Sequence, residues 1–228
     1  MLSIVIPAFN EETILQKTID NIYSWSKTNL IETELIVINN NSTDQTETIC
    51  KNNLTKYKNF RYENDRKKGK GFAVKKGINS SSYNKILILD ADLSVSVDQF
   101  NPKWLSYENI CISGSRFKGK VIGTPARRNL TGKGFSFLVK SLFNISVDDT
   151  QCGFKYISYN NIPLLVNKLT VGNFAYDVDF LLSVKSCNIE TVVKPVTYIH
   201  NIESSVSIFK DSLKMFFTLI KLRTKNFN

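Results

Sequence analysis

The sequence predicts an α/β fold with a doubly wound, mainly parallel β-sheet flanked by helices. Short apolar runs alternate with amphipathic segments along residues 2–90, and this order is typical of consecutive βαβ units. Polar, loop-forming segments follow the predicted strands, and sheets of this class bind ligands beyond the carboxyl ends of their strands. A chain of 228 residues is also long enough to bury one sizeable core.

The N-terminal half is predicted to contain four strands separated by three helices. The expected strands are residues 2–7, 33–39, 60–64 and 85–90, and the expected helices are residues 10–25, 42–53 and 69–79. In the first helix, Ile19, Ile22 and Trp25 recur on one apolar face behind an acidic first turn. Ser42 or Thr43 is a suitable N-cap for the second helix.

The C-terminal half is predicted to be less regular. We expect a short helix at 97–105, strands at 110–116, 149–158 and 190–199, and helices at 127–144, 175–186 and 207–223. The domain is expected to span residues 1–205. Residues 206–228 are expected to form an amphipathic helix that either packs on the domain or lies on a membrane surface with its apolar side down.

The charge is strongly positive and unevenly distributed. The net charge of +10 favours an anionic partner, such as a nucleic acid, a nucleotide, a phosphorylated lipid or an anionic membrane face. Residues 109–147 contain no acidic residue. They contain seven cations: Arg116, Lys118, Lys120, Arg127, Arg128, Lys133 and Lys140. A solvated basic surface and a phosphate-binding surface both fit this run.

Other features of the sequence exclude several classes of protein. The four cysteines are widely spaced without a CxxC pair, so we expect neither a zinc site nor a disulfide framework, and a reducing compartment fits. The chain enters a strand at once, so no signal peptide is expected. No apolar run approaches the length of a membrane span. His200 is expected to be a loop residue, and Cys152 a small packed residue.

Asp90 and Asp92 stand at the end of a predicted strand whose four consecutive apolar residues, 86–89, indicate burial on both faces. In an extended segment, residues i and i+2 point to the same side, so both carboxylates can face one ligand. Hard oxygen donors with open positions suit Mg²⁺ or Mn²⁺. We therefore expect a divalent cation to be their positive partner. Two aspartates that only cap the loop after the strand would show the same Asp-x-Asp spacing, so this structural role stays open.

Further residues are suited to binding phosphate. Lys70 stands between two glycines at a helix start, where an ammonium and a backbone can approach a diphosphate. The glycine spacing fits neither the P-loop nor the dinucleotide-binding pattern. Arg116 follows a strand, and Arg127 and Arg128 open a helix, so each can contact phosphate. An ordinary surface role for Lys70 remains an alternative.

Six motifs occur along the chain in a fixed order. They are SIVIPAFNEE (3–12), NNNSTDQT (39–46), GKGFAVKKGI (69–78), LILDADLS (87–94), SGSRF (113–117) and DTQCGFK (149–155). Together they resemble the family 2 glycosyltransferases of the GT-A fold. Within that family they are most similar to the polyprenyl-phosphate and dolichyl-phosphate sugar synthases, in particular the β-glucosyl branch. The resemblance spans about residues 2–205.

The resemblance implies inverting transfer of a hexose from a nucleotide diphosphate sugar, with UDP-glucose favoured, to a polyprenyl phosphate. The implied cofactor is Mg²⁺ or Mn²⁺, and the implied location is the cytoplasmic face of a membrane, peripherally bound. The residues implied for the nucleotide sugar are Pro7, Ala8, Asn10, Glu12, Asn40, Asp44, Lys70 and Asp90, with Glu11 nearby.

The remaining implied roles concern the metal, the phosphates and catalysis. Asp90 and Asp92 would hold the metal. The implied phosphate and acceptor residues are Arg116, Arg127, Arg128, Asp149, Gln151 and Lys155, and the implied catalytic residues are Asp90, Asp92, Asp177 and Arg116.

The sequence departs from the family pattern in three places. Asn39, Asn40 and Asn41 stand where many members have Asp-Asp-Gly, so an aspartate that commonly contacts uracil is an asparagine, and UDP and GDP both stay open. Gly172 and Asn173 stand where the glucosyl branch often has Glu-Arg-Trp. The membrane helices of many relatives are absent from this sequence.

The chemistry of the acceptor favours a phosphate over a hydroxyl. A hydroxyl needs a general base, whereas a phosphate monoester, with a second pKa of about 6, is already largely dianionic at neutral pH and needs positioning by cations. Asp149 or Asp177 could act as the base, so a glycan or protein hydroxyl acceptor stays open.

A third alternative is a non-catalytic module that binds nucleotides or nucleic acid through its basic residues. Such a module has no need of Asp-x-Asp. The basic run also lacks the interleaved aromatics of single-strand binders, so no nucleic acid partner is expected.

Overall fold

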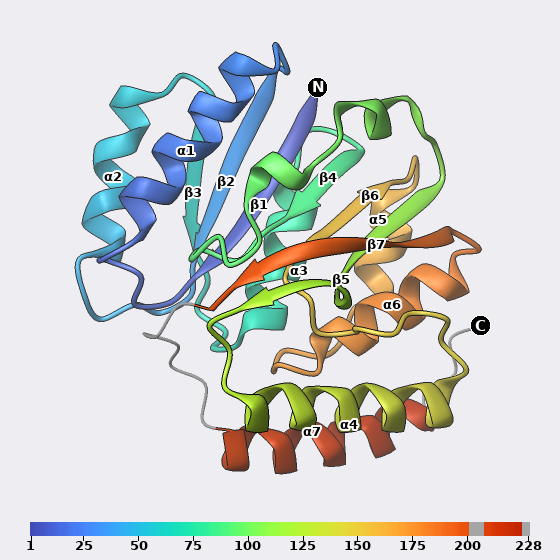
Figure 1. The fold of residues 1–228 in the computed structure, drawn as a ribbon. Coiled ribbons are helices and arrows are strands. Elements are labelled where there is room, and N and C mark those ends of the chain that lie inside the picture. Colours follow the sequence, from blue (N-terminus) through green and yellow to red (C-terminus); the bar gives the residue numbers. More distant parts are fainter. Residues whose placement is uncertain (201–207, 225–228) are drawn as a thin grey trace.

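The computed structural model describes residues 1–200 and 208–224, and their side chains except those of residues 126–131, 208–214 and 216. In this part of the chain, seven strands form one sheet with helices on both faces (Figure 1). The strands are β1 (Leu2–Ala8), β2 (Thr33–Asn39), β3 (Phe60–Asn64), β4 (Lys85–Ile88), β5 (Ile110–Ile122), β6 (Lys155–Ser158) and β7 (Glu190–Ile199). The helices are α1 (Leu15–Thr28), α2 (Thr46–Lys56), α3 (Lys70–Ser80), α4 (Ala126–Phe143), α5 (Ile162–Lys168), α6 (Tyr176–Ser186) and α7 (Ile208–Arg223).

The strand order is β3-β2-β1-β4-β6-β5-β7, and the predicted mainly parallel sheet is confirmed. The pairs among β1, β2, β3 and β4 are parallel, as is the pair of β5 and β7. By contrast, β6 runs antiparallel to both of its neighbours, β4 and β5. The predicted strand at 149–158 was therefore too long, because residues 149–154 form the loop that brings the chain to the start of β6.

The core consists of two apolar layers, one on each face of the sheet. On β1, Ile4 and Ile6 pack in the layer that contains α1, whereas Val5 packs in the layer that contains α3 and α6. This division follows from the alternation of side chains along a strand. The predicted inward residues Ile19, Ile22 and Trp25 of α1 are buried, which confirms the apolar face inferred from their spacing.

Helices α1 and α2 each begin later than predicted. The residues before them bond to one another across the two loops, since the Asn10 amide donates to Ser42 Oγ (3.0 Å) and the Gln45 amide donates to Glu12 Oε2 (2.8 Å). The predicted acidic first turn of α1 and the predicted Ser42 or Thr43 cap of α2 are therefore wrong. These side chains hold the two loops together instead of capping helices.

Besides the shorter strand β6, the C-terminal half differs from the prediction in three places, the first of which is β5, since it continues past residue 116 to Ile122. The expected short helix at 97–105 is two 3₁₀ turns, Val97–Gln99 and Pro102–Ser106. Helix α5 was not predicted at all. Helices α4 and α7 lie side by side below the sheet (Figure 1). Among the described residues, no helix is both long enough and apolar enough to cross a membrane.

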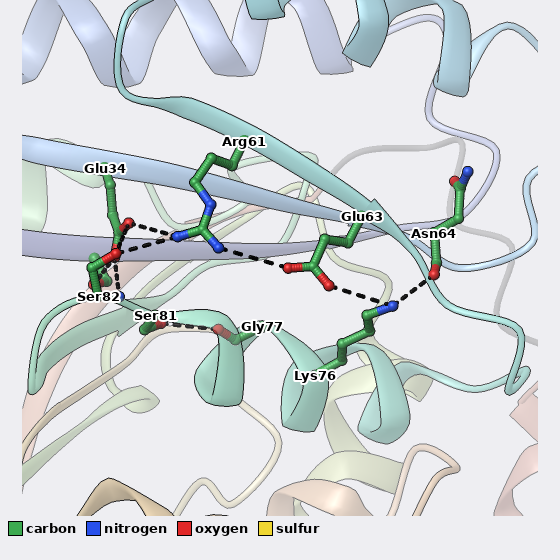
Figure 2. A network of polar contacts seen from close by, with 9 residues as sticks. Glu34, Arg61, Glu63, Asn64, Lys76, Gly77, Ser81 and Ser82 are labelled. Atoms are coloured by element: carbon green, nitrogen blue, oxygen red, sulfur yellow. Dashed lines mark hydrogen bonds and ion pairs between the residues drawn. The ribbon is translucent and has the colours of Figure 1, made fainter.

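A buried carboxylate joins three elements at the end of the sheet where β1 and β2 begin. Glu34 accepts hydrogen bonds from Ser3 Oγ (2.5 Å), from the amide (2.5 Å) and hydroxyl (2.8 Å) of Ser82, and from Arg61 Nη1 (3.2 Å). Figure 2 shows Arg61 between Glu34 and Glu63. Because buried polar groups destabilise a fold when they lose their partners, this network anchors β2 to β3 and to the end of α3.

Replacing Glu34 with Ala should lower the free energy of unfolding by about 1–3 kcal/mol, because Ser3, Ser82 and Arg61 lose a common acceptor. Urea denaturation followed by circular dichroism measures this change. The matched control is Glu63→Ala, which removes a partly exposed carboxylate 3.8 Å from the same arginine and should cost under about 1 kcal/mol. Equal losses in the two variants would contradict the role given to Glu34.

Candidate active site

The residues that carry chemistry gather at the edge of the sheet where β1, β2 and β4 end. Helix α3 begins at this edge, and the loop 89–94 follows β4 there. The antiparallel direction of β6 adds a further segment, since Lys155 at the start of β6 pairs with Ile88 on β4 and with Ser113 on β5. The loop 148–154, which precedes Lys155, is thereby placed beside Asp90.

The positive partner of Asp90 is Lys70. The Lys70 ammonium lies 2.5 Å from Asp90 Oδ1 and 5.8 Å from the centre of the Tyr176 ring. Burial alone would raise the pKa of Asp90, but the charges of Lys70, Lys155 and Arg116 outweigh it and hold the pKa below its ordinary value. Asp90 is therefore ionised at neutral pH.

Asp92 lies on the turn that follows Asp90. Its two carboxylate oxygens accept hydrogen bonds from the amide (2.9 Å) and the hydroxyl (2.6 Å) of Ser94. These bonds orient the carboxylate on the turn. The turn itself contains Leu93 with a positive φ of 45°, a conformation that the surrounding bonds must hold in place.

Glu11 is a third carboxyl group close to the pair. Burial, followed by the negative charges of Asp92 and Asp90, raises the pKa of Glu11 to about 7. The Glu11 amide donates to Thr46 Oγ1 (2.8 Å), which fixes the loop between β1 and α1. The sequence motifs predicted only that Glu11 lies near the nucleotide, and no sequence signal indicated its closeness to Asp92.

Arg116 and Asp149 form a two-pronged ion pair. Arg116 Nε and Nη2 each lie 2.7 Å from one oxygen of Asp149, and the Arg116 amide donates to the same carboxylate. Asp149 is fully buried, whereas the Arg116 side chain is 23% exposed. Burial alone would lower the pKa of Arg116, but Asp149 raises it further above its ordinary value. Arg116 therefore stays charged, and its guanidinium is the partly exposed member of the pair.

Lys155 and Asp177 form a second, deeper ion pair. The Lys155 ammonium contacts Asp177 Oδ1 and donates to the Cys152 carbonyl (2.6 Å), and both side chains are almost fully buried. Burial raises the pKa of Asp177, although Lys155 and Lys70 act in the opposite direction. Both partners lie behind Asp90, where the charge of Lys155 also acts on that residue.

Gly153 allows the loop 148–154 to approach Asp90. A Cβ atom on Gly153 would lie 2.0 Å from Asp90 Oδ2, far inside van der Waals contact. Any side chain at this position would therefore displace the Asp90 carboxylate. Gly153 belongs to the motif at 149–155, but its role could not be predicted from the sequence. Its contact with Asp90 forms only because β6 pairs with β4 in the antiparallel direction.

The other predicted residues lie outside this charged cluster. Pro7 and Ala8 are buried at the end of β1. Asn10, Glu12 and Asp44 make the bonds between the β1–α1 and β2–α2 loops. Arg127 and Arg128 lie outside the described side chains.

Asn40 and Gln151 have specific partners in the structure. The Asn40 side chain donates to the Lys67 carbonyl (2.7 Å) and accepts from the Gly69 amide (2.7 Å), so it holds the loop that leads into α3. Gln151 Nε2 contacts Met215 Sδ on α7 at 3.8 Å. Both ends of the Asn40 amide thus bond to the backbone of this loop.

The donor set of the site fits a hard divalent cation. Among the described residues, no group of three or more His, Cys, Asp or Glu side chains is placed to hold a metal ion. Asp90 and Asp92 nevertheless offer carboxylate oxygens on one turn, and Mg²⁺ is usually bound through one or two carboxylates together with water and substrate phosphates.

Comparison with known protein families identifies the chain. The model for the family described as glycosyl transferase family 2 matches residues 3–159, which include Lys70, Asp90, Arg116 and Asp149. The chain belongs to glycosyl transferase family 2. It is therefore a glycosyltransferase, and the family predicted from the sequence motifs is confirmed.

Several relatives within this family share a name. A protein named dolichyl-phosphate beta-glucosyltransferase from Dictyostelium discoideum is 28% identical over 240 residues, which cover 97% of this chain and 73% of the relative. A Homo sapiens protein of the same name is 30% identical over 200 residues, which cover 79% of this chain and 61% of the relative.

Solved structures of low sequence identity share the fold. Glucosyl-3-phosphoglycerate synthase from Mycobacterium tuberculosis, in complex with Mn²⁺, UDP-glucose and phosphoglyceric acid, superimposes with a TM-score of 0.74 at 18% identity, covering 99% of this chain and 80% of that chain. A complex of the same enzyme with phosphoglyceric acid gives a TM-score of 0.70 at 19% identity, over 97% and 79% of the two chains. The GT-A fold predicted from the sequence is confirmed.

Replacing Gly153 with Ala should lower the rate of glycosyl transfer at least about tenfold, a loss of about 1.4 kcal/mol of transition-state stabilisation, because the new Cβ displaces Asp90. Initial rates with a labelled sugar nucleotide measure this effect. The matched control is Gly134→Ala on α4, where an added Cβ meets nothing within 4 Å. A Gly153→Ala enzyme as fast as the Gly134→Ala control would contradict the close packing.

Proposed function

We propose that this glycosyltransferase transfers a hexose, glucose from UDP-glucose, to a polyprenyl phosphate, with inversion and with the help of Mn²⁺ or Mg²⁺. One observation carries the choice of acceptor. The two carboxylates that sequence analysis offered as a base for a hydroxyl acceptor, Asp149 and Asp177, are buried in ion pairs with Arg116 and Lys155. Neither carboxylate is therefore suited to act as the general base that a hydroxyl acceptor needs, whereas a phosphate acceptor needs none.

On the donor side, Lys70 is the cation that we assign to the diphosphate. An ammonium group attracts phosphate oxygens, and Lys70 stands beside the carboxylate proposed to hold the metal. A divalent cation held by Asp90 and Asp92 would neutralise charge on the diphosphate as it leaves. Lys70 keeps Asp90 ionised and oriented toward the site, and the Ser94 bonds orient Asp92.

On the acceptor side, the Arg116 guanidinium is the described cation suited to a phosphate monoester. The phosphate is largely dianionic at neutral pH, so it can attack the anomeric carbon without a general base. One bond forms between the phosphate oxygen and the anomeric carbon as the bond from that carbon to UDP breaks. Asp149 keeps the guanidinium plane fixed, so the cation is already oriented when the acceptor binds.

A second candidate function, transfer to a glycan or protein hydroxyl, is favoured by Glu11. The pKa of Glu11 is raised to about 7, which is suitable for a general base near neutral pH. Its loop, however, joins that of Asp44 on the side proposed for the nucleotide. We therefore rank this function second and separate the two by the choice of acceptor.

The purified protein should transfer labelled glucose from UDP-glucose to polyprenyl phosphate in the presence of Mn²⁺, and not to the polyprenyl alcohol of the same length. Partitioning of the label into organic solvent measures the product. Because an amide binds a divalent cation poorly, Asp92→Asn should lower the rate about 100-fold, the size typical of losing one electrostatic contact to the transition state.

The control for Asp92→Asn is Asp98→Asn. Asp98 likewise accepts a bond from a neighbouring hydroxyl, that of Ser96 (2.6 Å), but it is exposed outside the site, so the rate should not change. Transfer to a hydroxyl acceptor that needs Glu11, with none to polyprenyl phosphate, would establish the second candidate instead. An Asp92→Asn enzyme of full activity would contradict the proposed metal role.

A surface next to the site supports action at the cytoplasmic face of a membrane. Phe137 on α4 is 74% exposed and Phe217 on α7 is 62% exposed, and these two helices lie side by side (Figure 1). Exposed cations flank them: Lys133, Lys140, Lys221 and Arg223. Helix α4 contains no acidic residue. Apolar side chains beside cations are suited to the interface of an anionic bilayer.

Replacing Phe217 with Ser should lower the partition coefficient onto vesicles containing phosphatidylserine about tenfold, because one apolar side chain no longer enters the interface. Sedimentation with the vesicles measures the bound fraction. The matched control is Leu54→Ser on α2, an exposed apolar residue (48%) remote from this surface. Equal effects of the two substitutions, or no binding by the unchanged protein, would contradict the proposed membrane surface.

A further inference from the structure

We propose that α7 is coupled to the donor site through Asn173, so that a lipid surface bound to α7 and a nucleotide sugar bound near Lys70 strengthen one another. Asn173 is then a positioning residue of the reaction. This inference rests on the proposed function and adds a mode of regulation to it. The motifs of the sequence left Gly172 and Asn173 without a role, and the structure gives them one.

Asn173 joins α7 to the loop 169–175. Its Nδ2 donates to Thr218 Oγ1 on α7 (2.8 Å), and its Oδ1 accepts from the Ala175 amide (2.8 Å) just before α6. The other end of the loop is held by Asp179, whose Oδ2 accepts from the amides of Thr170 and Val171. A loop fixed in this way transmits a displacement of α7 instead of absorbing it.

The same loop packs directly on the first turn of α3. The Gly71 amide donates to the Gly172 carbonyl (2.8 Å), and a Cβ on Gly69 would lie 2.3 Å from that carbonyl oxygen. A Cβ on Gly172 would lie 2.1 Å from the ring of Phe72. With no free space at this contact, a shift of Gly172 moves Lys70, which lies between Gly69 and Gly71 and holds Asp90.

A second contact reaches Asp90 from its other side. Gln151 Nε2 contacts the sulfur of Met215, a buried residue of α7, at 3.8 Å. Gln151 lies in the loop 148–154, in which Gly153 packs against the Asp90 carboxylate. Helix α7 therefore touches both of the loops that set the position of Asp90.

The lipid-facing and site-facing residues of α7 are neighbours. Phe217, proposed to enter the membrane interface, precedes Thr218, which contacts Asn173. A bilayer that holds α7 in this position also holds the loop 169–175 against α3, and a nucleotide sugar that binds Lys70 holds the same contact from the other end. Thermodynamic linkage requires the two effects on affinity to be equal.

The test measures binding alone, without an acceptor. The dissociation constant of UDP-glucose with Mn²⁺ is determined by calorimetry, with and without vesicles of phosphatidylcholine and phosphatidylserine. Vesicles should tighten UDP-glucose binding to the unchanged protein about fivefold or more. Thr218→Val keeps the size of the side chain and removes the acceptor of Asn173, so it should abolish this gain while vesicle binding is unchanged.

Three further variants separate coupling from a general loss of structure. Thr224→Val, next to the end of α7, removes a hydroxyl that bonds to the Lys221 carbonyl of the same helix, and it should retain the full gain. Asn173→Ala should abolish the gain, and the double variant Asn173→Ala/Thr218→Val should lose no more of it than either single variant, since each of the three breaks the bond between Asn173 and Thr218.

Several results would overturn the inference. One is equal affinity for UDP-glucose with and without vesicles, and another is a Thr218→Val protein that keeps the gain or no longer binds vesicles. If such a protein still glucosylated polyprenyl phosphate, the proposed function would stand and only the coupling would fail. A protein that did not bind UDP-glucose at all would overturn both.

Discussion

The ion pair between Lys70 and Asp90 is the interaction on which the candidate site depends. Asp90 follows the apolar strand β4, where an uncompensated carboxylate would cost on the order of several kcal/mol. Two further cations, Lys155 and Arg116, act on Asp90 from the other side, and each has a carboxylate partner of its own. Charges alternate through the site, so each buried group is stabilised and Asp90 stays ionised.

This arrangement requires three segments to meet at one edge of the sheet. The carboxyl end of β4 supplies Asp90, the start of α3 supplies Lys70, and the loop before β6 supplies Asp149 and Gly153. The third segment arrives only because β6 runs antiparallel to β4 and β5. Because Gly153 has no side chain, the backbone of this loop packs against the Asp90 carboxylate and fixes the orientation of that carboxylate.

The same geometry underlies the proposed link between the chemistry and a lipid surface. Helices α4 and α7 present exposed aromatic and basic side chains, while α7 contacts the loops 148–154 and 169–175 on either side of the site. In the proposed function, the acceptor lies in a bilayer and α7 rests on its surface. Binding at that surface and ordering of the site would then involve the same contacts, so each would strengthen the other.

Much of the fold and part of the site could be predicted from the sequence, because they depend on local patterns. Hydrophobic periodicity predicted the strands and helices around Asp90, and the order of six motifs predicted the family that residues 3–159 confirm. The closeness of Glu11 to Asp92, the burial of Asp177 with Lys155, and the commitment of Asn40 to the loop before α3 were not predictable in this way.

Those features depend on which distant segments pack together and on what each side chain meets there. The sequence by itself determined that carboxylates, a lysine and an arginine stand at the ends of predicted strands. Only the tertiary structure decided that the positive partner of Asp90 within the protein is Lys70, and that the carboxylates considered as bases are paired with cations. The direction of β6 and the close approach of Gly153 to Asp90 depend on residues far apart in the sequence. The periodicity of apolar residues indicates only the local structure of each segment, so it could not predict these contacts.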